Sequence, residues 1–227
     1  MRILALDTAG TSCSAALTDD RRILAQRTVA FGQSHNRHLM PLIDSVLAAG
    51  GLRLAEVDLL AVTRGPGSFT GVRIGLATVQ ALALAGGLPV VPVSSLEALA
   101  LQAAPREGRV AVLLDARRAE VYQGIYRMAG GELQALVPEA VLAPEAAASR
   151  IALPCRLVGS GVRAYALRIA AVLGAGAGWG PPEAHLLQAA TVARLARARA
   201  DRAVAPEDLA PCYLRAALTR GPGVAKA

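Results

Sequence analysis

Residues 2–12 read RILALDTAGTS, and this stretch decides the fold. Arg2–Leu6 is almost wholly apolar, which predicts a buried strand that ends at Asp7. A polar turn follows, and Cys13–Leu17 returns as a second strand. In such a turn, backbone amides and hydroxyls can hold phosphates while the aspartate holds a metal. The simpler alternative is an aspartate that forms an Asx turn at the end of a strand.

The second half of the chain repeats this pattern. Val110–Leu114 is an apolar stretch that ends at Asp115, and Glu120–Arg127 reads as its partner strand. We therefore predict an internal duplication, with an N-terminal subdomain over residues 1–104 and a C-terminal subdomain over residues 105–227. The turn of the second copy contains Arg117 and Arg118 and no glycine, and such bulk argues against a working phosphate cradle.

Strand, aspartate, turn and strand in this order resemble the phosphate loops of the actin, Hsp70 and sugar-kinase superfamily. The resemblance implies an α/β protein with an actin-like (ASKHA, RNase H-like) fold, in which two related α/β subdomains have mixed sheets. A glycine turn after the strand at 156–158 resembles the adenosine-side turn of that superfamily. The expected vestigial nucleotide cleft consists of Asp7, Thr8, Thr11, Ser12, Asp115, Gly159 and Gly161.

Two helices are predicted between these copies. Residues 35–49 carry an apolar stripe at helical spacing, with Ser34 as the expected N-cap. After the strand Leu59–Thr63, Ser68 is expected to cap a helix that runs to about Ala85. Its two glycines, Gly71 and Gly75, each cost about 1 kcal/mol relative to alanine, so another backbone is expected to approach this face closely.

Composition excludes several classes of function. The chain has a net charge of +7, but its densest basic run, Arg194, Arg197, Arg199 and Arg202, has no interleaved aromatic residue to stack on bases. Ile74–Leu96 is uncharged and long enough for a membrane span, but glycines and prolines interrupt it, so we expect no membrane segment. Three scattered cysteines favour a reducing cytoplasm. His35 and His38 have no acidic or cysteine neighbour, and we predict neither a metal site nor a complete catalytic constellation.

Residues 64–75, RGPGSFTGVRIG, resemble the signature of the bacterial TsaB (YeaZ) family. The matching segments also include Leu6-Asp7-Thr8, residues 38–44 (HLMPLID), residues 93–99 (VSSLEAL) and residues 115–122 (DARRAEVY). The Tyr213-Leu214-Arg215 segment continues the match, so the resemblance covers nearly the whole chain and is most specific over residues 1–125.

The resemblance implies a place in the TsaB–TsaD–TsaE complex. In that pathway a separate enzyme makes threonylcarbamoyl-adenylate, and TsaD transfers the threonylcarbamoyl group to the adenosine beside the anticodon of tRNAs that read A-starting codons. TsaD holds a metal with two histidines of an N-H-L-x-x-H run, where this chain has Ser95 and Leu99. Neither side chain replaces an imidazole as a ligand. The expected role is a cytoplasmic, non-catalytic partner subunit without a cofactor, which reaches tRNA only through the complex.

The resemblance also implies that the first two helices form the partner interface, with TsaD as a heterodimer or with a second copy when the chain is alone. The residues expected there are His38, Leu39, Leu42, Ile43, Val46, Phe69, Gly71, Val72, Arg73, Gly75 and Leu76. The alternative is that both helices simply cover their own sheet. Two other functions stay open, an ATP-dependent phosphotransferase of the same superfamily and a metallopeptidase.

Overall fold

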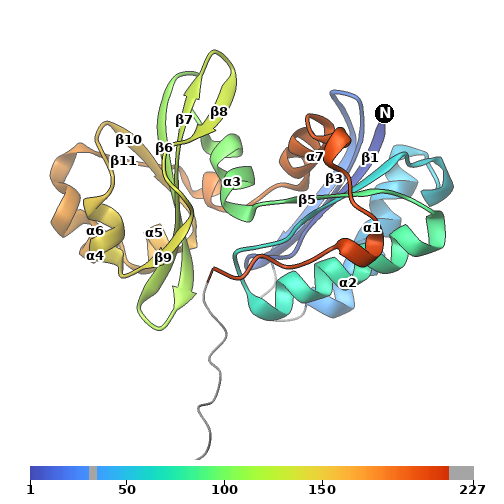
Figure 1. Ribbon diagram of the computed structural model, residues 1–227, viewed down its shortest axis with the longest axis horizontal. Coiled ribbons are helices and arrows are strands. Elements are labelled where there is room, and N and C mark those ends of the chain that lie inside the picture. Colours follow the sequence, from blue (N-terminus) through green and yellow to red (C-terminus); the bar gives the residue numbers. More distant parts are fainter. Residues whose placement is uncertain (31–34, 215–227) are drawn as a thin grey trace, which may run out of the picture.

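The structure, a computed structural model, describes residues 1–30 and 35–214 and consists of two lobes that lie side by side (Figure 1). The strands are β1 (Arg2–Asp7), β2 (Ser12–Asp19), β3 (Arg22–Ala30), β4 (Leu59–Thr63), β5 (Val90–Val93), β6 (Gly108–Arg117), β7 (Glu120–Ala129), β8 (Glu132–Ala135), β9 (Ala140–Leu142), β10 (Cys155–Val158) and β11 (Ala177–Trp179). The α-helices are α1 (His35–Gly50), α2 (Phe69–Gly86), α3 (Ser95–Ala103), α4 (Pro144–Ser149), α5 (Ser160–Ala164), α6 (Ala166–Leu173) and α7 (Ala189–Arg197). Short 3-10 helices are η1 (Leu54–Glu56), η2 (Gly174–Gly176), η3 (Pro182–His185), η4 (Ala200–Arg202) and η5 (Pro206–Asp208).

Each lobe is built on one mixed sheet, and the two sheets have the same plan. The first has the order β3-β2-β1-β4-β5, and the second has the order β8-β7-β6-β10-β11, with β9 paired to β7. In both sheets the first three strands of this order are antiparallel and the last three are parallel. The predicted α/β fold with two related halves is therefore confirmed, and Asp115 on β6 corresponds to Asp7 on β1.

The first sheet is buried on both faces, which explains the continuous apolar runs of β1 and β4. Because side chains alternate along a strand, Leu4 and Leu6 of β1 pack with α1 and α2, whereas Ile3 and Ala5 join the core on the other face. Ser34, the expected cap of α1, and the side chain of His35 lie outside the described residues.

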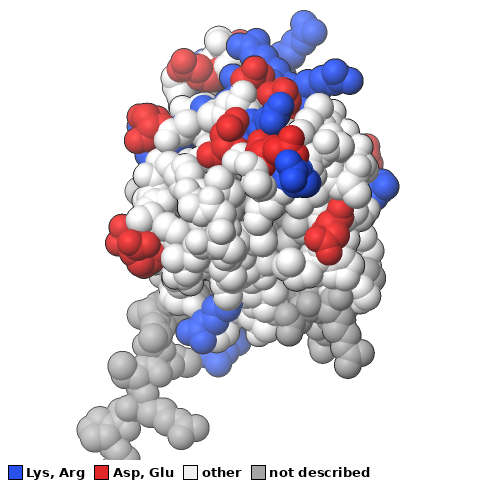
Figure 2. Space-filling model, turned by 90° about the vertical axis from the view of Figure 1, so that its right-hand side faces the viewer, with Lys and Arg blue, Asp and Glu red and all other residues white. Residues whose placement is uncertain are grey.

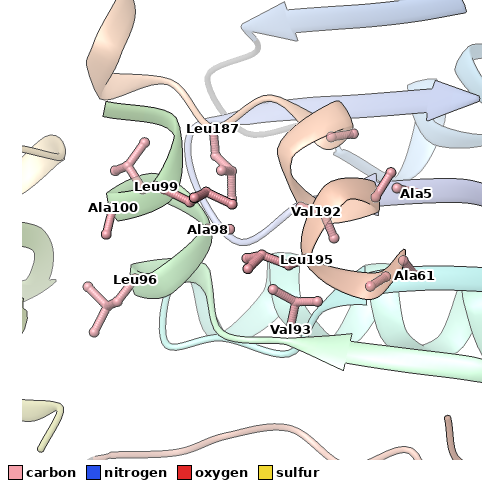
Figure 3. Packing of buried hydrophobic residues seen from close by; sticks show 14 of the residues in the cluster. Ala5, Ala61, Val93, Leu96, Ala98, Leu99, Ala100, Leu187, Val192 and Leu195 are labelled. Carbon is pink, nitrogen blue, oxygen red and sulfur yellow. The ribbon is translucent and has the colours of Figure 1, made fainter. Parts of the chain in front are cut away.

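The two lobes share one hydrophobic core, which connects them through α3 and α7. These two helices pack against each other (Figure 3). The helix α3 follows the last strand of the first sheet but packs on β6 and β7 of the second sheet. Conversely, α7 lies against β1 and β2 of the first sheet. Residues 105–227 were expected to form one subdomain, whereas the structure places α7 and the segment that follows it against the first lobe. The two halves therefore exchange helices across the core.

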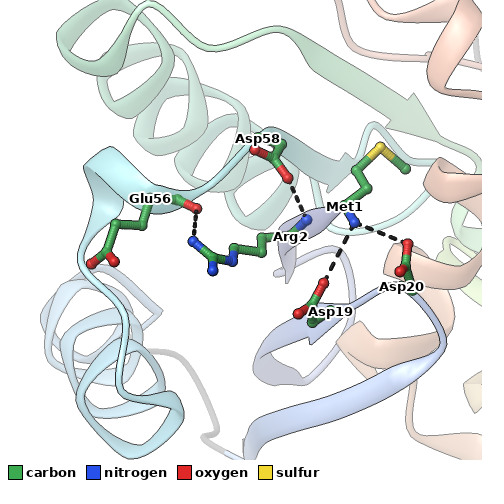
Figure 4. Close-up of polar contacts among 6 residues, drawn as sticks. All are labelled: Met1, Arg2, Asp19, Asp20, Glu56 and Asp58. Atoms are coloured by element: carbon green, nitrogen blue, oxygen red, sulfur yellow. Dashed lines mark hydrogen bonds and ion pairs between the residues drawn. The ribbon is translucent and has the colours of Figure 1, made fainter.

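The start of β1 is fixed at the end of the first lobe that lies away from the second lobe (Figure 4). The amino group of Met1 donates to Asp20 at 2.9 Å and to Asp19 at 3.4 Å. The backbone N–H of Arg2 donates to Asp58 at 2.7 Å. These contacts tie β1 to its neighbouring strands at the end opposite Asp7.

Candidate functional site

Asp7, at the end of β1, is the centre of the first expected phosphate loop, and the structure buries it. Its carboxylate oxygen Oδ1 accepts hydrogen bonds from the hydroxyl of Thr63 at 2.6 Å and from the backbone N–H of Ala9 at 3.2 Å. Its Oδ2 is buried without a hydrogen-bond partner. Burial raises the pKa of Asp7 to about 6, although the two hydrogen bonds lower it. Asp7 is therefore part of the core and does not face a ligand.

The turn after Asp7 is covered by the beginning of α2. The hydroxyl of Thr8 donates to the backbone carbonyl of Gly71 at 2.7 Å, and the N–H of Ser68 donates to the carbonyl of Ala9 at 2.8 Å. A Cβ added at Gly71 would lie 2.1 Å from the carbonyl oxygen of Thr8, and one at Gly67 would lie 2.3 Å from that of Ala9. The loop that would approach a phosphate is thus occupied by the protein's own backbone.

Two further residues of this expected loop differ in exposure, since Ser12 is buried and Thr11 is exposed. Ser12 lies in β2 opposite Ala30 of β3. The loop therefore presents Gly10 and Thr11 to solvent but keeps its aspartate and both flanking hydroxyls inside.

The second expected phosphate loop is closed in a different way. The carboxylate of Asp115 accepts hydrogen bonds from the N–H of Arg117 at 2.8 Å and from the hydroxyl of Tyr165 at 3.0 Å, and it pairs with the Arg117 guanidinium at 3.3 Å. Arg117, Arg118 and Ala119 all have positive φ, between 55° and 62°. The predicted bulk of this turn is confirmed, and its own arginine neutralises the aspartate.

The glycine turn after β10 has a packing role. Gly159 and Gly161 are buried, and a Cβ at Gly159 would lie 2.3 Å from the carbonyl oxygen of Leu113 on β6. The turn is also held by His185, whose Nδ1 accepts from the N–H of Gly159 at 3.0 Å and whose Nε2 lies 3.1 Å from the carbonyl oxygen of Gly180. The glycines therefore let α5 approach β6, as Gly71 lets α2 approach the loop after β1.

The apolar stripe of α1 is also internal. Leu39, Leu42, Ile43 and Val46 are buried in the core between α1, α2 and the first sheet. His38 is partly exposed. The stripe covers the sheet on which α1 lies, as an amphipathic helix must. That α1 contributes to a partner interface stays a prediction.

Most of the residues expected on α2 also lie inside the lobe. Val72 and Leu76 are buried, and Gly71 and Gly75 face Thr8 of the same chain. The close backbone approach inferred from these glycines is real, but it lies within the lobe. Of the expected interface residues on α2, Phe69 and Arg73 are exposed.

The opposite side of α2 is an exposed and nearly uncharged surface, here called the outward α2 face. It consists of Phe69, Thr70, Arg73, Ala77, Ala81 and Leu84. Phe69 is 56% and Leu84 is 65% exposed. A shallow groove of ≈ 420 Å³ lies along its first half. Figure 2, which views the molecule from the first-lobe side, has most of its charged side chains toward the top and a broad uncharged area below them.

Sequence reasoning missed this face, although a signal was present. Arg73 is the one charged residue in the 18 residues of α2, whereas a surface helix normally carries a polar face. By length and composition α2 could span a membrane, but this is weak evidence because helices of soluble proteins pass the same test. Only 33% of α2 is buried in the structure, so its apolar character exceeds what covering the first sheet requires.

An aromatic pair at the beginning of this face was also unforeseen. The rings of Phe69 and Tyr213 stack with their centroids 5.6 Å apart, and the guanidinium carbon of Arg73 lies 3.9 Å from the Phe69 ring centroid. The Arg73 Nε–H donates to the Tyr213 hydroxyl at 3.0 Å. The three side chains therefore bind one another at the surface.

A polar cluster lies where the lobes meet. The carboxylate of Glu139 accepts a hydrogen bond from the Ser94 hydroxyl of the first lobe and another, at 2.8 Å, from the Tyr126 hydroxyl of the second. Burial and the adjacent Glu139 both raise the pKa of Tyr126. Beside this cluster, the guanidinium of Arg199 binds both carboxylate oxygens of Glu97 on α3. These contacts hold the lobes together, and the Arg199 pair removes one member of the expected basic run.

Ser95 and Leu99, which stand where the resemblance would require histidine ligands, are both buried in α3. Leu99 is part of the core between α3 and α7 (Figure 3). Within residues 1–30 and 35–214, no group of three or more histidine, cysteine, aspartate or glutamate side chains could hold a metal ion.

Comparisons with known proteins agree with this architecture. The family model of TsaD, tRNA N6-adenosine threonylcarbamoyltransferase, matches residues 28–170. The chain is 42% identical over 148 residues to the tRNA threonylcarbamoyladenosine biosynthesis protein TsaB of Escherichia coli, a match that covers 64% of each chain. It is 34% identical over 139 residues to the TsaB protein of Bacillus subtilis, which covers 61% of each. The matched segments thus span somewhat less than two thirds of these relatives.

Solved structures give a fuller match. YeaZ from Pseudomonas aeruginosa superposes with a TM-score of 0.78 and 36% sequence identity, over 94% of this chain and 99% of that one. The activator of the 2-hydroxyisocaproyl-CoA dehydratase from Clostridium difficile superposes with a TM-score of 0.52 at 12% identity, which indicates a shared fold.

Proposed function

Because this chain belongs to the TsaB (YeaZ) family, we propose that it is a non-catalytic partner subunit in the formation of threonylcarbamoyladenosine on tRNA. In this proposal it binds and stabilises the catalytic TsaD subunit, and the pair works with TsaE on the adenosine beside the anticodon of tRNAs that read A-starting codons. The observation that carries the proposal is the outward α2 face, which is apolar and exposed in a chain whose own phosphate loops are filled.

The outward α2 face has the properties of a helix-packing surface. Thr70, Ala77 and Ala81 are small, so a partner helix can approach closely, and Phe69 and Leu84 supply large apolar side chains at its two ends. A contiguous apolar surface of this kind is a recognised mark of a protein–protein interface. Because the TsaD family model matches a segment that includes α1 and α2, a TsaD partner would present an equivalent pair of helices.

Three observations support a non-catalytic role. The carboxylates of Asp7 and Asp115 are engaged by groups of the same chain. Gly71 packs against the backbone carbonyl of Thr8 in the first loop, and Gly159 packs against that of Leu113. Finally, Ser95 and Leu99 are buried parts of α3 rather than groups directed at a ligand. We therefore propose neither a metal nor a cofactor for this chain.

Contact with tRNA is proposed to be indirect. Arg199, one of the four arginines of the basic run, is bound to Glu97 and so serves the fold. A cytoplasmic location is proposed from the cysteines, because no disulfide joins any two of Cys13, Cys155 and Cys212.

The test is to mix the purified chain with TsaD from the same organism and to measure the molar mass of the product by size-exclusion chromatography with light scattering. The chain alone is measured in parallel, which also detects a homodimer. A stoichiometric complex is expected. A mixture that elutes as two separate proteins, with and without ATP, would contradict the proposal.

The competing function is an ATP-dependent phosphotransferase or ATPase of the actin-like superfamily. It requires an open loop around Asp7, and the N-terminal end of α2 closes that loop. Measuring ATP turnover by the isolated chain decides between the two. We expect no turnover above the level of an Asp7→Asn variant, and a rate that this substitution abolishes would favour the enzyme.

A further inference from the structure

Residues 204–214, here called the C-terminal strap, leave α7 and run back along the first lobe (Figure 1). The strap begins with a backbone bridge in which Val204 and Val90 exchange two hydrogen bonds, at 2.8 and 3.1 Å. Farther along, the side-chain amide of Gln80 on α2 donates to the carbonyl oxygen of Pro206 at 3.0 Å. Leu209 then packs against the core below α1 and α2.

The end of the strap reaches three places that are otherwise separate. The N–H of Cys212 donates to the carbonyl oxygen of Arg64 at 2.7 Å, in the loop that leads to Gly67 and so covers the turn after Asp7. Tyr213 binds Phe69 and Arg73 on the outward α2 face. Leu214 packs against the core that both lobes share.

The strap also approaches the contact between the lobes. Burial raises the pKa of the Cys212 thiol, and the nearby Glu139 carboxylate adds to this increase while Arg64 opposes it. Glu139 is the residue that accepts the hydrogen bond of Ser94 across the lobes. One short segment therefore contacts the loop at Arg64, the outward α2 face and the core that both lobes share.

We propose that the C-terminal strap is a releasable latch, which opens locally from Leu214 and Tyr213 inward and which partner docking on the outward α2 face holds shut. The latch closes the loop over Asp7 and completes the docking surface at the same time. This inference rests on the proposed function for the identity of the partner, although the opening of the latch is a property of the isolated chain.

The anchors of the strap explain why its outer end opens without unfolding of the lobe. Apart from one 3-10 turn, the strap has no secondary structure of its own, and Pro206 and Pro211 limit its hydrogen bonding. Its outer anchor consists of Tyr213, which is exposed together with Phe69 and Arg73, and of Leu214, which is only partly buried. Segments with few buried apolar contacts and solvent-exposed hydrogen bonds open by local fluctuation, with free energies well below that of global unfolding.

The direction of the coupling follows from the position of Tyr213. A partner that covers Phe69 also covers the stacked Tyr213 ring, so it binds the closed latch better than the open one. A ligand shifts an equilibrium by its differential affinity for the two states, so docking must close the latch. By the same reciprocity, a variant whose latch opens more often binds the partner more weakly.

Cysteine labelling of the isolated chain tests the latch, because Cys212 lies in the strap while Cys13 and Cys155 are buried in the two sheets. The rate of modification of each cysteine by iodoacetamide is followed by peptide mass spectrometry. We expect Cys212 to react at least roughly 100 times faster than the other two, because it needs only local opening. Tyr213→Ala should speed the reaction of Cys212 about tenfold and leave those of Cys13 and Cys155 unchanged.

Two variants and a second measurement keep this test specific. Tyr213→Phe retains the ring stack but loses the hydroxyl that binds Arg73, so about a threefold increase is expected. Trp179→Ala removes an exposed aromatic ring from the second lobe and should have no effect. Hydrogen exchange of the Cys212 N–H, which depends on opening rather than on thiol chemistry, should follow the same order. Cys212 reacting as slowly as Cys13 in the wild type and in Tyr213→Ala would overturn the latch.

The coupling is tested by repeating the labelling with TsaD in excess. At a concentration about ten times the dissociation constant, we expect Cys212 to react roughly tenfold more slowly, and the other cysteines as before. A complex in which the Cys212 rate is unchanged would overturn the coupling but leave the proposed function intact. Absence of any complex would contradict the proposed function and the coupling together, whereas the opening of the latch is decided on the isolated chain alone.

Discussion

The hydroxyl of Thr8 donates a hydrogen bond to the backbone carbonyl of Gly71, with an oxygen–oxygen distance of 2.7 Å. This bond joins the turn after β1 to the first turn of α2, and it is possible because Gly71 has no side chain. A Cβ at this position would lie 2.1 Å from the carbonyl oxygen of Thr8. The same contact therefore explains a costly glycine in a helix and a phosphate loop that is closed to ligands.

The first prediction follows from this contact. Gly71→Ala should lower the free energy of unfolding by at least about 2 kcal/mol, because the overlap with the Thr8 carbonyl outweighs a gain of roughly 1 kcal/mol in helix propensity. Urea unfolding followed by circular dichroism measures the change. Gly10→Ala is the control, in the turn after β1 that Gly71 contacts, since no atom lies within 4 Å of its added Cβ. Equal stability of the two variants would contradict the close packing.

The second prediction concerns Asp7, whose pKa is raised from 3.8 in the unfolded chain to about 6 by burial. Between these values the folded protein keeps a proton that the unfolded chain has lost. Asp7 therefore makes the free energy of unfolding fall as pH rises from about 4 to about 6, by up to about 3 kcal/mol. Below pH 4 this contribution is fully present, and above pH 6 it is lost.

An Asp7→Asn variant isolates this effect. Its side-chain oxygen can still accept the hydrogen bonds of Thr63 and Ala9, but it does not titrate. As the pH rises from 4 to 7, the free energy of unfolding of the wild type should thus fall relative to that of the variant. Asp44→Asn, which changes an exposed carboxylate on α1, should follow the wild type. A difference between wild type and Asp7→Asn that stays constant across this range would contradict the burial of a titrating Asp7.

The third prediction concerns the ion pair between α3 and the segment after α7. Arg199 and Glu97 form two hydrogen bonds, and their side chains are 30% and 17% exposed. A partly buried, bidentate pair should have a coupling energy of about 1 to 2 kcal/mol, above that of a surface pair. A double-mutant cycle with Glu97→Ala and Arg199→Ala, measured by urea unfolding, gives this value. If the two substitutions change the free energy of unfolding additively, the pair does not couple α3 to the segment after α7.

Local patterns were sufficient to predict many elements of the fold. The apolar run at Leu59–Thr63 gave β4 with the observed bounds. Ser68 caps α2 as predicted, since its hydroxyl oxygen accepts from the N–H of Gly71. The duplication was visible because both halves begin with an apolar strand and an aspartate. These features depend on neighbouring residues, and short-range physics determines them.

Long-range relationships could not be predicted in this way. The stripe of Leu39, Leu42 and Ile43 identifies the apolar side of α1, but periodicity does not say whether a sheet or a partner covers it. Similarly, Gly75 indicates a close neighbour without naming it, and the neighbour is Thr8. The position of α7 on the first sheet and the contact of Arg73 with Tyr213, 140 residues apart, depend on how the whole chain folds.

The central claim is that the outward α2 face binds a catalytic partner. Ala81 lies on that face between Ala77 and Leu84, and Ala171 is an exposed alanine of α6 in the second lobe. Substituting either by arginine introduces a charge at an exposed helical position and should leave the folded monomer intact. The two variants therefore differ in the surface that they alter.

The most direct measurement is the affinity of these two variants for TsaD by isothermal titration calorimetry, with thermal unfolding as the check on folding. We expect Ala81→Arg to weaken binding at least about 30-fold, because the charge must be buried without a partner, and Ala171→Arg to bind like the wild type. Wild-type affinity in a folded Ala81→Arg variant would show that the outward α2 face does not bind TsaD.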